Sequence, residues 1–548
     1  MQSRALHKMS KFYITTSIPY VNAPPHIGHA LEFAQADAIA RWRRMRGDDV
    51  FFLTGTDEHG AKIARAAEAA GKDTQVFVDE QSQRFRDLVV KLSILPSDMI
   101  RTSDKERHWP GAQEMWKRIT DRGDMYKGVY KGLYCVGHEA FVTERDLKDG
   151  VCEDHGKKPE YIEEENYFFH LSEYAAEVKR QIEEGYLEVV PRSRRNEILA
   201  FLSEKVEDIS FSRPARDIPW GIPVPGDSSN TMYVWCDALT NYISALGFGG
   251  SSDERMRTYW PCDVHLVGKD IARFHALIWP AMLLSAGLPL PKRIFVHGHI
   301  HSGGKKMSKS LGNVIDPFSL IETYGAEAVR YILLGHVPAF GDVDLTLDRI
   351  HELYTAHLAN GVGNLVSRVT AMSVQYFEGS ISRPLDALLA SVPFKSDIDV
   401  LDAGDRNLKV GDVTPKTFIR DVTVPRYIIS WERYRSDEAL REVMVLLRML
   451  DRYIQDYEPF KLVKSDKEQV QAILWNLVSS IHHASYLLRP FLPGTADAIA
   501  GVLGVPPDET QEDLARRTAY TLTKRGPLFP RVDPVRNKAQ TTHTPPSP

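Results

Sequence analysis

Residues 11–29 read KFYITTSIPYVNAPPHIGH, and this stretch indicates the fold of the chain. The run 11–18 is rich in residues that favour strands, and the helical pattern that follows it stops at Gly47. A second short apolar strand is expected over residues 50–54. This alternation of strand, helix and strand predicts a βαβ unit, and therefore an α/β fold with a doubly wound, parallel, Rossmann-like sheet.

The same rhythm returns far downstream, where Val264–Val267 and Ile294–Val296 are short apolar runs followed by glycine and polar residues. Ligands of open α/β sheets bind beyond the carboxyl ends of the strands. The polar residues that follow the predicted strand ends are Asp57, Asp270, His297 and His299. We therefore expect a binding site at these ends.

The first of two sequence motifs, Pro25–His29, opens a helix that we expect to be amphipathic. His26 and His29 can donate hydrogen bonds to phosphate oxygens at a helix N-terminus, where free backbone N–H groups also face anions. Gly28 leaves room for a nucleotide to approach the backbone. Taken alone, the motif also fits a capped surface helix.

The second motif, Lys306–Ser310, follows an apolar strand and lies among glycines. Its cations, Lys306 and Lys309, stand in a loop that can close over pyrophosphate, although the motif alone also fits a solvated surface loop. In this order, the two motifs predict the halves of an ATP site at which a carboxylate attacks the α-phosphorus. Such a site positions two reactants and neutralises charge, so it needs no nucleophile from the protein.

This ordered pair of motifs resembles the signature of class I aminoacyl-tRNA synthetases. The flanking residues resemble those of the methionyl-tRNA synthetases, from about Phe12 to about Leu528. The resemblance implies an enzyme that activates methionine with Mg²⁺-ATP, releases pyrophosphate, and transfers methionine from methionyl-adenylate to the 3′-terminal adenosine of tRNA(Met) for translation. It implies catalytic roles for His26, His29, Lys306 and Lys309. The ATP-binding residues that it implies are His26, Gly28, His29, Asp270, Lys306, Met307, Ser308 and Lys309.

A methionine side chain needs an apolar, aromatic-lined pocket, and its ammonium group needs a carboxylate. By the resemblance, Asp57 is that carboxylate. The other methionine-binding residues that it implies are Ser17, Ile18, Tyr20, Trp235, Ala238, Tyr242, Ile271 and His275. The alternative is that these aromatic residues are only core. Glu32 is expected to orient ATP or the tRNA end, or else to be an exposed helix carboxylate, and Leu239 stands where many relatives have proline.

Four metal-ligand residue types occur as two pairs, each with two residues between its members. These residues are Cys135, His138, Cys152 and His155, and 13 residues separate the pairs. Such spacing predicts one closed, structural Zn²⁺ site with Cys₂His₂ ligation. The alternative is a metal-free remnant that packing holds together, and relatives usually carry cysteine where this chain has His138.

The predicted domains follow from where the strand–helix rhythm stops and helical periodicity begins. They are a catalytic first half over 11–119, an inserted connective domain with the zinc knuckle over 120–213, a catalytic second half over 214–344, an α-helical anticodon-binding domain over 345–530 and a disordered tail over 531–548. Within the helical part, residues 393–426 lack a helical period and are predicted to form a polar, β-leaning surface insertion.

Recognition of tRNA is expected in the helical part. Asn364 and Arg368 lie one turn apart on a predicted helix, and Phe460 follows the end of another. By the resemblance these residues bind the anticodon, because loop bases are recognised through edge hydrogen bonds and aromatic stacking. Many relatives have tryptophan at the position of Phe460, and the alternative for Asn364 and Arg368 is an ordinary polar helix face.

Composition limits the classes of partner. The 548-residue chain has a net charge of −5, so a tRNA would have to bind local positive patches. Four cysteines are too few for a disulfide scaffold, and no apolar run is long enough to span a membrane. We therefore expect a cytoplasmic protein without membrane or DNA partners, and a monomer, because no oligonucleotide-binding module follows the helical part.

Three other hypotheses stay open at this point. Class I synthetases for leucine, isoleucine or valine usually carry a longer insertion, and the cysteine enzyme usually holds its metal in the active site. A small-molecule nucleotidyltransferase can share the first motif, but it would not need the helical C-terminal third. A catalytically inactive paralogue would only bind tRNA, but both motifs and Asp57 look intact.

Overall fold

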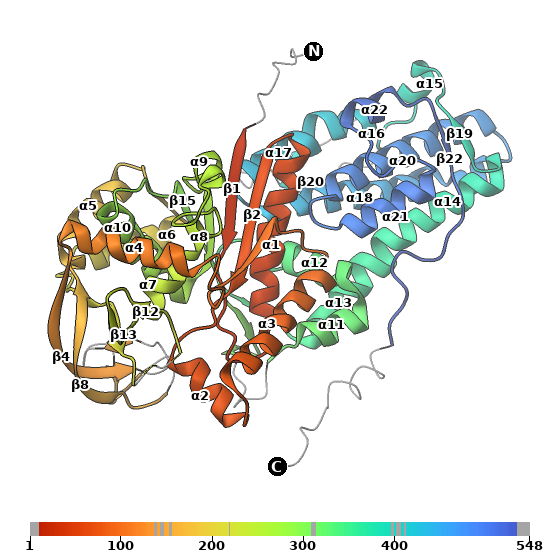
Figure 1. Cartoon of the computed structure of the whole chain (residues 1–548). Helices are drawn as coiled ribbons and strands as arrows, with labels where there is room; N and C mark the ends of the chain where they lie inside the picture. Colours follow the sequence, from red (N-terminus) through yellow and green to blue (C-terminus); the bar gives the residue numbers. More distant parts are fainter. Residues whose placement is uncertain are drawn as a thin grey trace. The chain divides into compact units, whose positions relative to one another are not determined.

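The computed structural model describes residues 10–135, 140–142, 147–152, 156–216, 218, 220–307, 314–395, 399–401, 407–409 and 413–533. The chain forms two compact units, Met1–His299 and Ile300–Pro548, whose elements are labelled in Figure 1. Among the described residues, no helix combines the length and the apolar composition that crossing a membrane requires.

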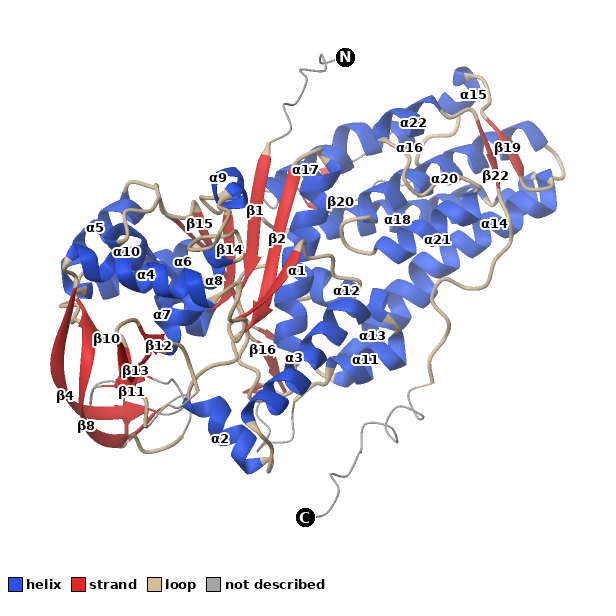
Figure 2. Ribbon diagram, viewed as in Figure 1, coloured by secondary structure: helices blue, strands red, loops and turns tan. Residues whose placement is uncertain are grey.

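The first unit is built on a parallel sheet with the strand order β3-β2-β1-β14-β15-β9. Its strands are β1 (Lys11–Thr16), β2 (Asp49–Thr56), β3 (Asp98–Arg101), β9 (Glu188–Val190), β14 (Val264–Gly268) and β15 (Arg293–His297). Every neighbouring pair is parallel, which confirms the predicted α/β class. From β1 the chain builds outward to β2 and β3. Strand β14 pairs with β1 on the side opposite β2 (Figure 2). The strand order therefore reverses between β1 and β14, and such a reversal is where α/β sheets bind ligands.

Helices surround this sheet. They are α1 (Ile27–Met45), α2 (Ala61–Ala69), α3 (Thr74–Lys91), α4 (Trp109–Arg122), α5 (Leu171–Glu183), α6 (Arg192–Leu202), α7 (Val234–Leu239), α8 (Asn241–Ser244), α9 (Glu254–Tyr259), η2 (Lys269–Ile271), η3 (Phe274–Ile278) and α10 (Trp279–Ser285). Helix α1 contacts β1, β2 and β14. The expectation that α1 is amphipathic was wrong, because all of residues 30–40 are buried. A helix without an exposed face belongs to the interior of a protein, and the alanines of α1 allow close packing there.

Two further antiparallel sheets belong to the first unit. One has the order β10-β8-β4-β5, and the other has the order β11-β13-β12. Their strands are β4 (Met125–Cys135), β5 (Ala140–Val142), β8 (Glu160–Phe169), β10 (Ile209–Ser210), β11 (Ser212–Pro214), β12 (Pro223–Val224) and β13 (Asp227–Met232), beside the short pair β6 (Leu147–Lys148) and β7 (Val151–Cys152). Strand β9 also lies within the range 120–213 that was predicted as an insertion, yet it pairs with β15 in the parallel sheet. That range therefore contributes an edge strand to the main sheet.

The second unit is mainly helical, and the predicted helical C-terminal region lies within it. Its helices are α11 (Pro317–Tyr324), α12 (Ala326–Gly335), α13 (Leu347–Leu353), η5 (Tyr354–Gly363), α14 (Asn364–Phe377), α15 (Asp386–Ala390), α16 (Pro415–Phe418), η6 (Ile419–Thr423), α17 (Val424–Glu432), α18 (Ser436–Tyr457), α19 (Pro459–Leu462), α20 (Lys467–Leu488), α21 (Pro493–Leu503) and α22 (Gln511–Arg516). Its short strands are β16 (Ile300–Ser302), β17 (Lys305–Lys306), β18 (Val343–Asp344), β19 (Ser380–Ser382), β20 (Asp399–Leu401), β21 (Asn407–Lys409) and β22 (Ala519–Thr521).

The prediction that residues 393–426 lack helix was partly wrong. Strands β20 and β21 do pair antiparallel, but α16, η6 and the start of α17 are helical. The Thr414 side chain accepts a hydrogen bond from the backbone N–H of Thr417, and Pro415 occupies the first turn, so the helix has a regular start. The threonines and valines of this stretch favour strands, and burial of Phe418 outweighs that preference. The predicted tail lies outside the described residues from position 534 onward.

Candidate active site

The segments that follow β1 and β2 continue side by side beyond the ends of the strands. The backbone N–H of Asp57 donates to Pro19 O at 2.9 Å, and that of Val21 donates to Asp57 O at 3.2 Å. Tyr20 and Asp57 therefore form a parallel bridge at the carboxyl edge of the sheet. The structure brings together two residues that were predicted to bind one amino acid, although 37 positions separate them in the sequence.

Asp57 is a buried carboxylate with a 3% exposed side chain. Its Oδ1 atom lies 3.4 Å from both Thr102 Oγ1 and the backbone N of His59. These two contacts are long for hydrogen bonds, and an ionised carboxylate forms shorter, charge-assisted bonds with cationic donors. A ligand ammonium group is such a donor.

The N-terminus of α1 is capped by the histidines of the first motif. His26 Nδ1 accepts the backbone N–H of Gly28 at 3.1 Å, and His29 Nδ1 accepts the backbone N–H of His26 at 3.1 Å. The two rings stack with their centroids 3.8 Å apart. A ring nitrogen that accepts a hydrogen bond carries no proton, so each neutral imidazole holds its proton on Nε2. The cap thus leaves an Nε2–H donor on each ring for a ligand anion.

Gly28 and the protonation of His29 support this arrangement. A Cβ atom at Gly28 would lie 2.9 Å from His26 Cε1, so glycine is needed for the capping ring itself as well as for the approach of a nucleotide. Burial lowers the pKa of His29 well below 6.5, and the neighbouring His26 lowers it further. His29 is therefore a neutral donor near pH 7.

Glu32 is buried, so the alternative of an exposed helix carboxylate was wrong. Its Oε1 accepts hydrogen bonds from the backbone N–H and the hydroxyl of Ser17, both at 2.6 Å. Its Oε2 lies 3.1 Å from His297 Nε2, and His297 Nδ1 lies 2.8 Å from Gly298 O. A carboxylate and a carbonyl both accept, so both ring nitrogens of His297 donate and the ring is an imidazolium. Burial opposes this charge, but Glu32 raises the pKa of His297 above 6.5.

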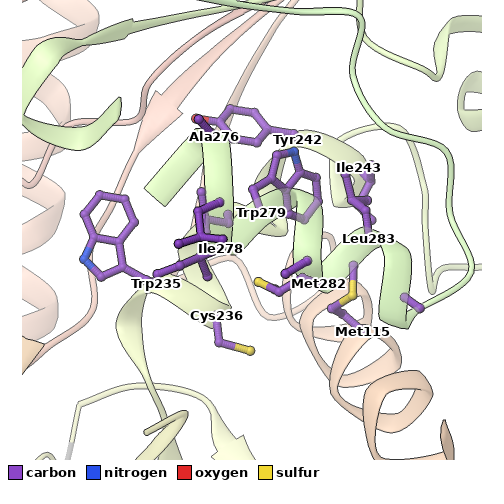
Figure 3. Packing of buried hydrophobic residues seen from close by; sticks show 14 of the residues in the cluster. Met115, Trp235, Cys236, Tyr242, Ile243, Ala276, Ile278, Trp279, Met282 and Leu283 are labelled. Atoms are coloured by element: carbon purple, nitrogen blue, oxygen red, sulfur yellow. The ribbon is translucent and has the colours of Figure 1, made fainter. Parts of the chain in front are cut away.

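Aromatic side chains meet next to this edge of the sheet. The Trp235 ring stacks on Phe274 with the centroids 3.8 Å apart, and Tyr20 meets Trp235 edge-on at 6.3 Å. Figure 3 shows Trp235 at one side of the buried cluster that also contains Tyr242 and Trp279. Trp235 Nε1 is buried and has no hydrogen-bond partner within the described part of the chain. The contact with Phe274 was missed, because sequence spacing does not show which of several neighbouring aromatic residues stack.

His275 is held as a neutral acceptor in the same cluster, with its ring edge-on to Trp235 at a centroid distance of 6.2 Å. Its Nδ1 lies 2.9 Å from Ile271 O, so Nδ1 carries the proton, and the Tyr242 hydroxyl donates to Nε2 at 2.7 Å. Burial lowers the pKa of His275 to about 4. Ala238 is buried on α7, and Ile18 and Ile271 are half-buried. Asp270 is exposed, with Oδ1 3.5 Å from His299 Nε2.

The remaining predicted residues belong to other elements or lie outside the described residues. Lys306 ends β17 and Met307 follows it, both in the second unit, whereas Ser308 and Lys309 lie outside the described residues. Of the predicted zinc ligands, Cys135 and Cys152 are 3% and 2% exposed and belong to one small buried cluster with Val142. His138 and His155 lie outside the described residues.

The predicted anticodon residues lie on α14 and α19. Asn364 is exposed at the start of α14. Arg368, one turn later, pairs through Nη1 with Asp451 Oδ1 at 2.7 Å. Phe460 is 44% exposed, which is unusual for a phenylalanine and leaves a ring face available for stacking.

The family described as tRNA synthetases class I (M) matches residues 12–152 and 142–370 of this chain. The chain belongs to this family. The synthetase is 40% identical over 529 residues to a methionine–tRNA ligase of Brucella suis biovar 1, covering 95% of this chain and 98% of that relative. It is also 40% identical over 536 residues to a methionine–tRNA ligase of Clostridium acetobutylicum, covering 96% of this chain and 79% of that relative.

A solved structure agrees with these sequence relatives. Mycobacterium tuberculosis methionyl-tRNA synthetase in complex with methionyl-adenylate superposes with a TM-score of 0.86 at 36% identity, covering 95% of this chain and 100% of that chain. The sequence relatives and the solved structure therefore both confirm the predicted family.

The pair formed by Glu32 and His297 gives the stability of the synthetase a defined pH dependence. Because the pKa of His297 is raised on folding, the stabilisation is complete below about pH 6.5 and is lost as the pH rises through the pKa of the folded protein. His297→Gln should therefore lower the stability of the first unit by about 1.5–3 kcal/mol at pH 6 and by less at pH 9. Thermal unfolding of both proteins at the two pH values measures this.

Glu32→Gln serves as the partner variant, because it removes the carboxylate that holds the proton on His297. It should abolish the same pH trend, and the double variant should add little. A stability gap between wild type and His297→Gln that is equal at pH 6 and pH 9 would contradict the imidazolium assignment.

Proposed function

We propose that this synthetase is a methionine–tRNA ligase, which activates methionine with Mg²⁺-ATP and transfers it to the 3′-terminal adenosine of tRNA(Met). One observation carries the proposal. At the carboxyl edge of one sheet, the chain combines a helix N-terminus with two Nε2–H donors, a buried carboxylate and an aromatic cluster. The extensive identity with methionine–tRNA ligases supports the same assignment.

The first step is the attack of the methionine carboxylate on the α-phosphorus of ATP, with pyrophosphate as the leaving group. His26 and His29 would stabilise the charge that develops on phosphate oxygens, because their Nε2–H groups are already oriented by the cap. Lys306 and Lys309 would neutralise the leaving pyrophosphate, and Asp270 would accept from the ribose hydroxyls. Mg²⁺ enters with ATP and neutralises its phosphates.

Methionine would be held at both of its ends. Asp57 would accept the ammonium group, and the stacked Trp235 would form one wall of the thioether pocket. The Tyr242–His275 hydrogen bond would fix a neighbouring wall of the pocket. Ser17, Ile18, Tyr20, Ala238 and Ile271 complete the proposed methionine site.

The decisive experiment is ATP–pyrophosphate exchange with each of the twenty amino acids. We expect exchange with methionine alone, since the pocket is apolar and aromatic. Exchange with leucine, isoleucine, valine or cysteine would assign another class I activity, and exchange with none would favour a tRNA-binding paralogue or a nucleotidyltransferase.

Two variants test the methionine-binding part and the ATP-binding part of the proposed site separately. Trp235→Ala should raise the KM for methionine far more than the KM for ATP, because it opens the apolar pocket. Lys309→Ala should lower kcat on the order of 10²-fold and leave the Kd for methionine nearly unchanged, because its charge acts on the phosphates in the transition state. A Trp235→Ala defect confined to the KM for ATP would exclude Trp235 from the methionine pocket.

We further infer one structural Zn²⁺ ion, with Cys135, His138, Cys152 and His155 as ligands. The donor set suits tetrahedral zinc, and its two cysteines are buried in one cluster, where thiolates need a cation. The purified protein should contain about one zinc per chain, and Cys135→Ser with Cys152→Ser should remove it and loosen the region around β4 and β5. Elemental analysis of freshly purified, unchelated protein measures this, and a zinc-free wild type would favour a metal-free remnant.

We also infer that Asn364, Arg368 and Phe460 bind the anticodon of tRNA(Met). Phe460→Ala should reduce the efficiency of tRNA charging by about 5- to 150-fold, because stacking on a base contributes roughly 1–3 kcal/mol. Phe460→Trp should be tolerated or improve the affinity, since the larger ring offers more stacking area. Methionine-dependent exchange without tRNA is the control and should stay at the wild-type rate.

Arg368→Ala is the companion variant in the same assay. It should weaken charging and also spare exchange. Normal charging by both alanine variants would place the anticodon contact elsewhere in the chain. Cysteines that form no disulfide support a cytoplasmic location. A single peak at the mass of one chain in light scattering would support a monomer.

A further inference from the structure

A buried carboxylate joins two histidines beside the proposed methionine site. Asp237, only 1% exposed, lies on α7. Its Oδ2 is 2.6 Å from His59 Nδ1, and its Oδ1 is 2.7 Å from His108 Nε2. The other nitrogen of His108, Nδ1, is 2.8 Å from Ser244 Oγ. Both histidines are at most 2% exposed, so solvent does not reach this network.

The directions of these hydrogen bonds follow from the carboxylate. An ionised carboxylate only accepts, so His59 donates through Nδ1 and His108 donates through Nε2. Burial alone would raise the pKa of Asp237, but the two histidines hold it below its ordinary value. Each carboxylate oxygen thus has one charge-assisted hydrogen bond, which is short and directional.

The network links the two ends of the proposed substrate site. His59 follows Asp57 by two residues, and its backbone N lies 3.4 Å from Asp57 Oδ1. Asp237 lies on the short helix α7 between Trp235 and Ala238. The His59 ring also packs edge-on against Trp109 and Trp220, with centroid distances of 6.0 and 5.9 Å. A shift of the Asp237 carboxylate would therefore move the ammonium end and the side-chain end relative to each other.

We propose that Asp237 is a positioning residue that, through His59 and His108, sets the distance between the ammonium-binding Asp57 and the thioether pocket at Trp235. The network thereby fixes the length of amino acid that the enzyme accepts. This inference rests on the proposed function. The stability of the fold does not require this buried ionic network, because replacing such a network with apolar residues is often neutral or stabilising. Directional bonds do hold a site to a fixed geometry, as discrimination between substrates requires.

The test compares methionine with ethionine, its homologue with one additional methylene, in ATP–pyrophosphate exchange. Asp237→Asn keeps the size of the side chain but replaces one accepting oxygen with an NH₂ group, so it cannot accept from both histidines in their present tautomers. We expect the KM for methionine to rise about tenfold and the KM for ATP to change less than twofold. The preference for methionine over ethionine should fall about tenfold, near the lower limit of what one methylene usually contributes to discrimination.

Asp124→Asn is the matched control. Asp124 is also a buried carboxylate of the first unit, with Oδ2 hydrogen-bonded by the hydroxyls of Tyr174 and Ser285, and it has no proposed role in the site. It should lower the thermal stability without changing the ethionine-to-methionine ratio. Should both variants change that ratio equally, or neither change it, the positioning role would be refuted.

Milder variants cover the case in which Asp237→Asn does not fold. Ser244→Ala removes only the outer hydrogen bond of His108 and should shift the ratio in the same direction by a smaller factor. His59→Asn should do so more strongly, and its effect should be non-additive with Ser244→Ala, because both act through one network. An unchanged ratio in both would also refute the proposal. A wild-type enzyme without methionine-dependent exchange would instead contradict the proposed function.

Discussion

The reversal of strand order between β1 and β14 is the constraint on which the rest of the site depends. Because both strands are parallel to β2, their carboxyl ends meet at one edge of the sheet. The backbone bridge between Tyr20 and Asp57 continues this pairing past the strands. The polar segments after three strands and the N-terminus of α1 thereby converge without any long loop. A reaction that needs positioning and charge stabilisation, but no protein nucleophile, is suited to such an edge.

The two histidines at the start of α1 show how one local structure serves folding and chemistry together. A helix N-terminus leaves backbone N–H groups without partners, and most helices satisfy some of them with serine, threonine or aspartate. Here His26 and His29 accept two of these groups through Nδ1. An aspartate in the same place would add a negative charge where phosphates are expected to bind. An imidazole caps the helix without that charge and presents a second nitrogen as a donor.

Local patterns predicted the sheet and the motifs but not the long-range polar contacts. Strand β1 and the start of α1 are visible in the sequence because periodicity and caps are local properties. The pairing of Glu32 with His297 joins residues 265 positions apart, and no spacing rule indicates it. The burial of α1 was missed for a related reason: the helical pattern was read as amphipathic, whereas packing with the strands decides exposure. Strand β9 lies inside the expected insertion, and its pairing with β15 likewise depends on tertiary packing that local patterns do not show.

The loop after β2 is anchored to several other elements of the first unit. Three consecutive polar residues begin there, and each contacts a different part of the unit. Glu58 receives two hydrogen bonds from Arg101 of β3, at 2.8 Å each, while His59 donates to Asp237 of α7. Asp57 lies between the strand and these anchors, and its Oδ1 is 3.4 Å from both Thr102 Oγ1 and the backbone N of His59. Rigid neighbours on both sides therefore position the Asp57 carboxylate before any ligand binds. Such anchoring suits a site that must bind an ammonium group without reorganising, because the loop is already ordered on folding and its ordering does not weaken binding.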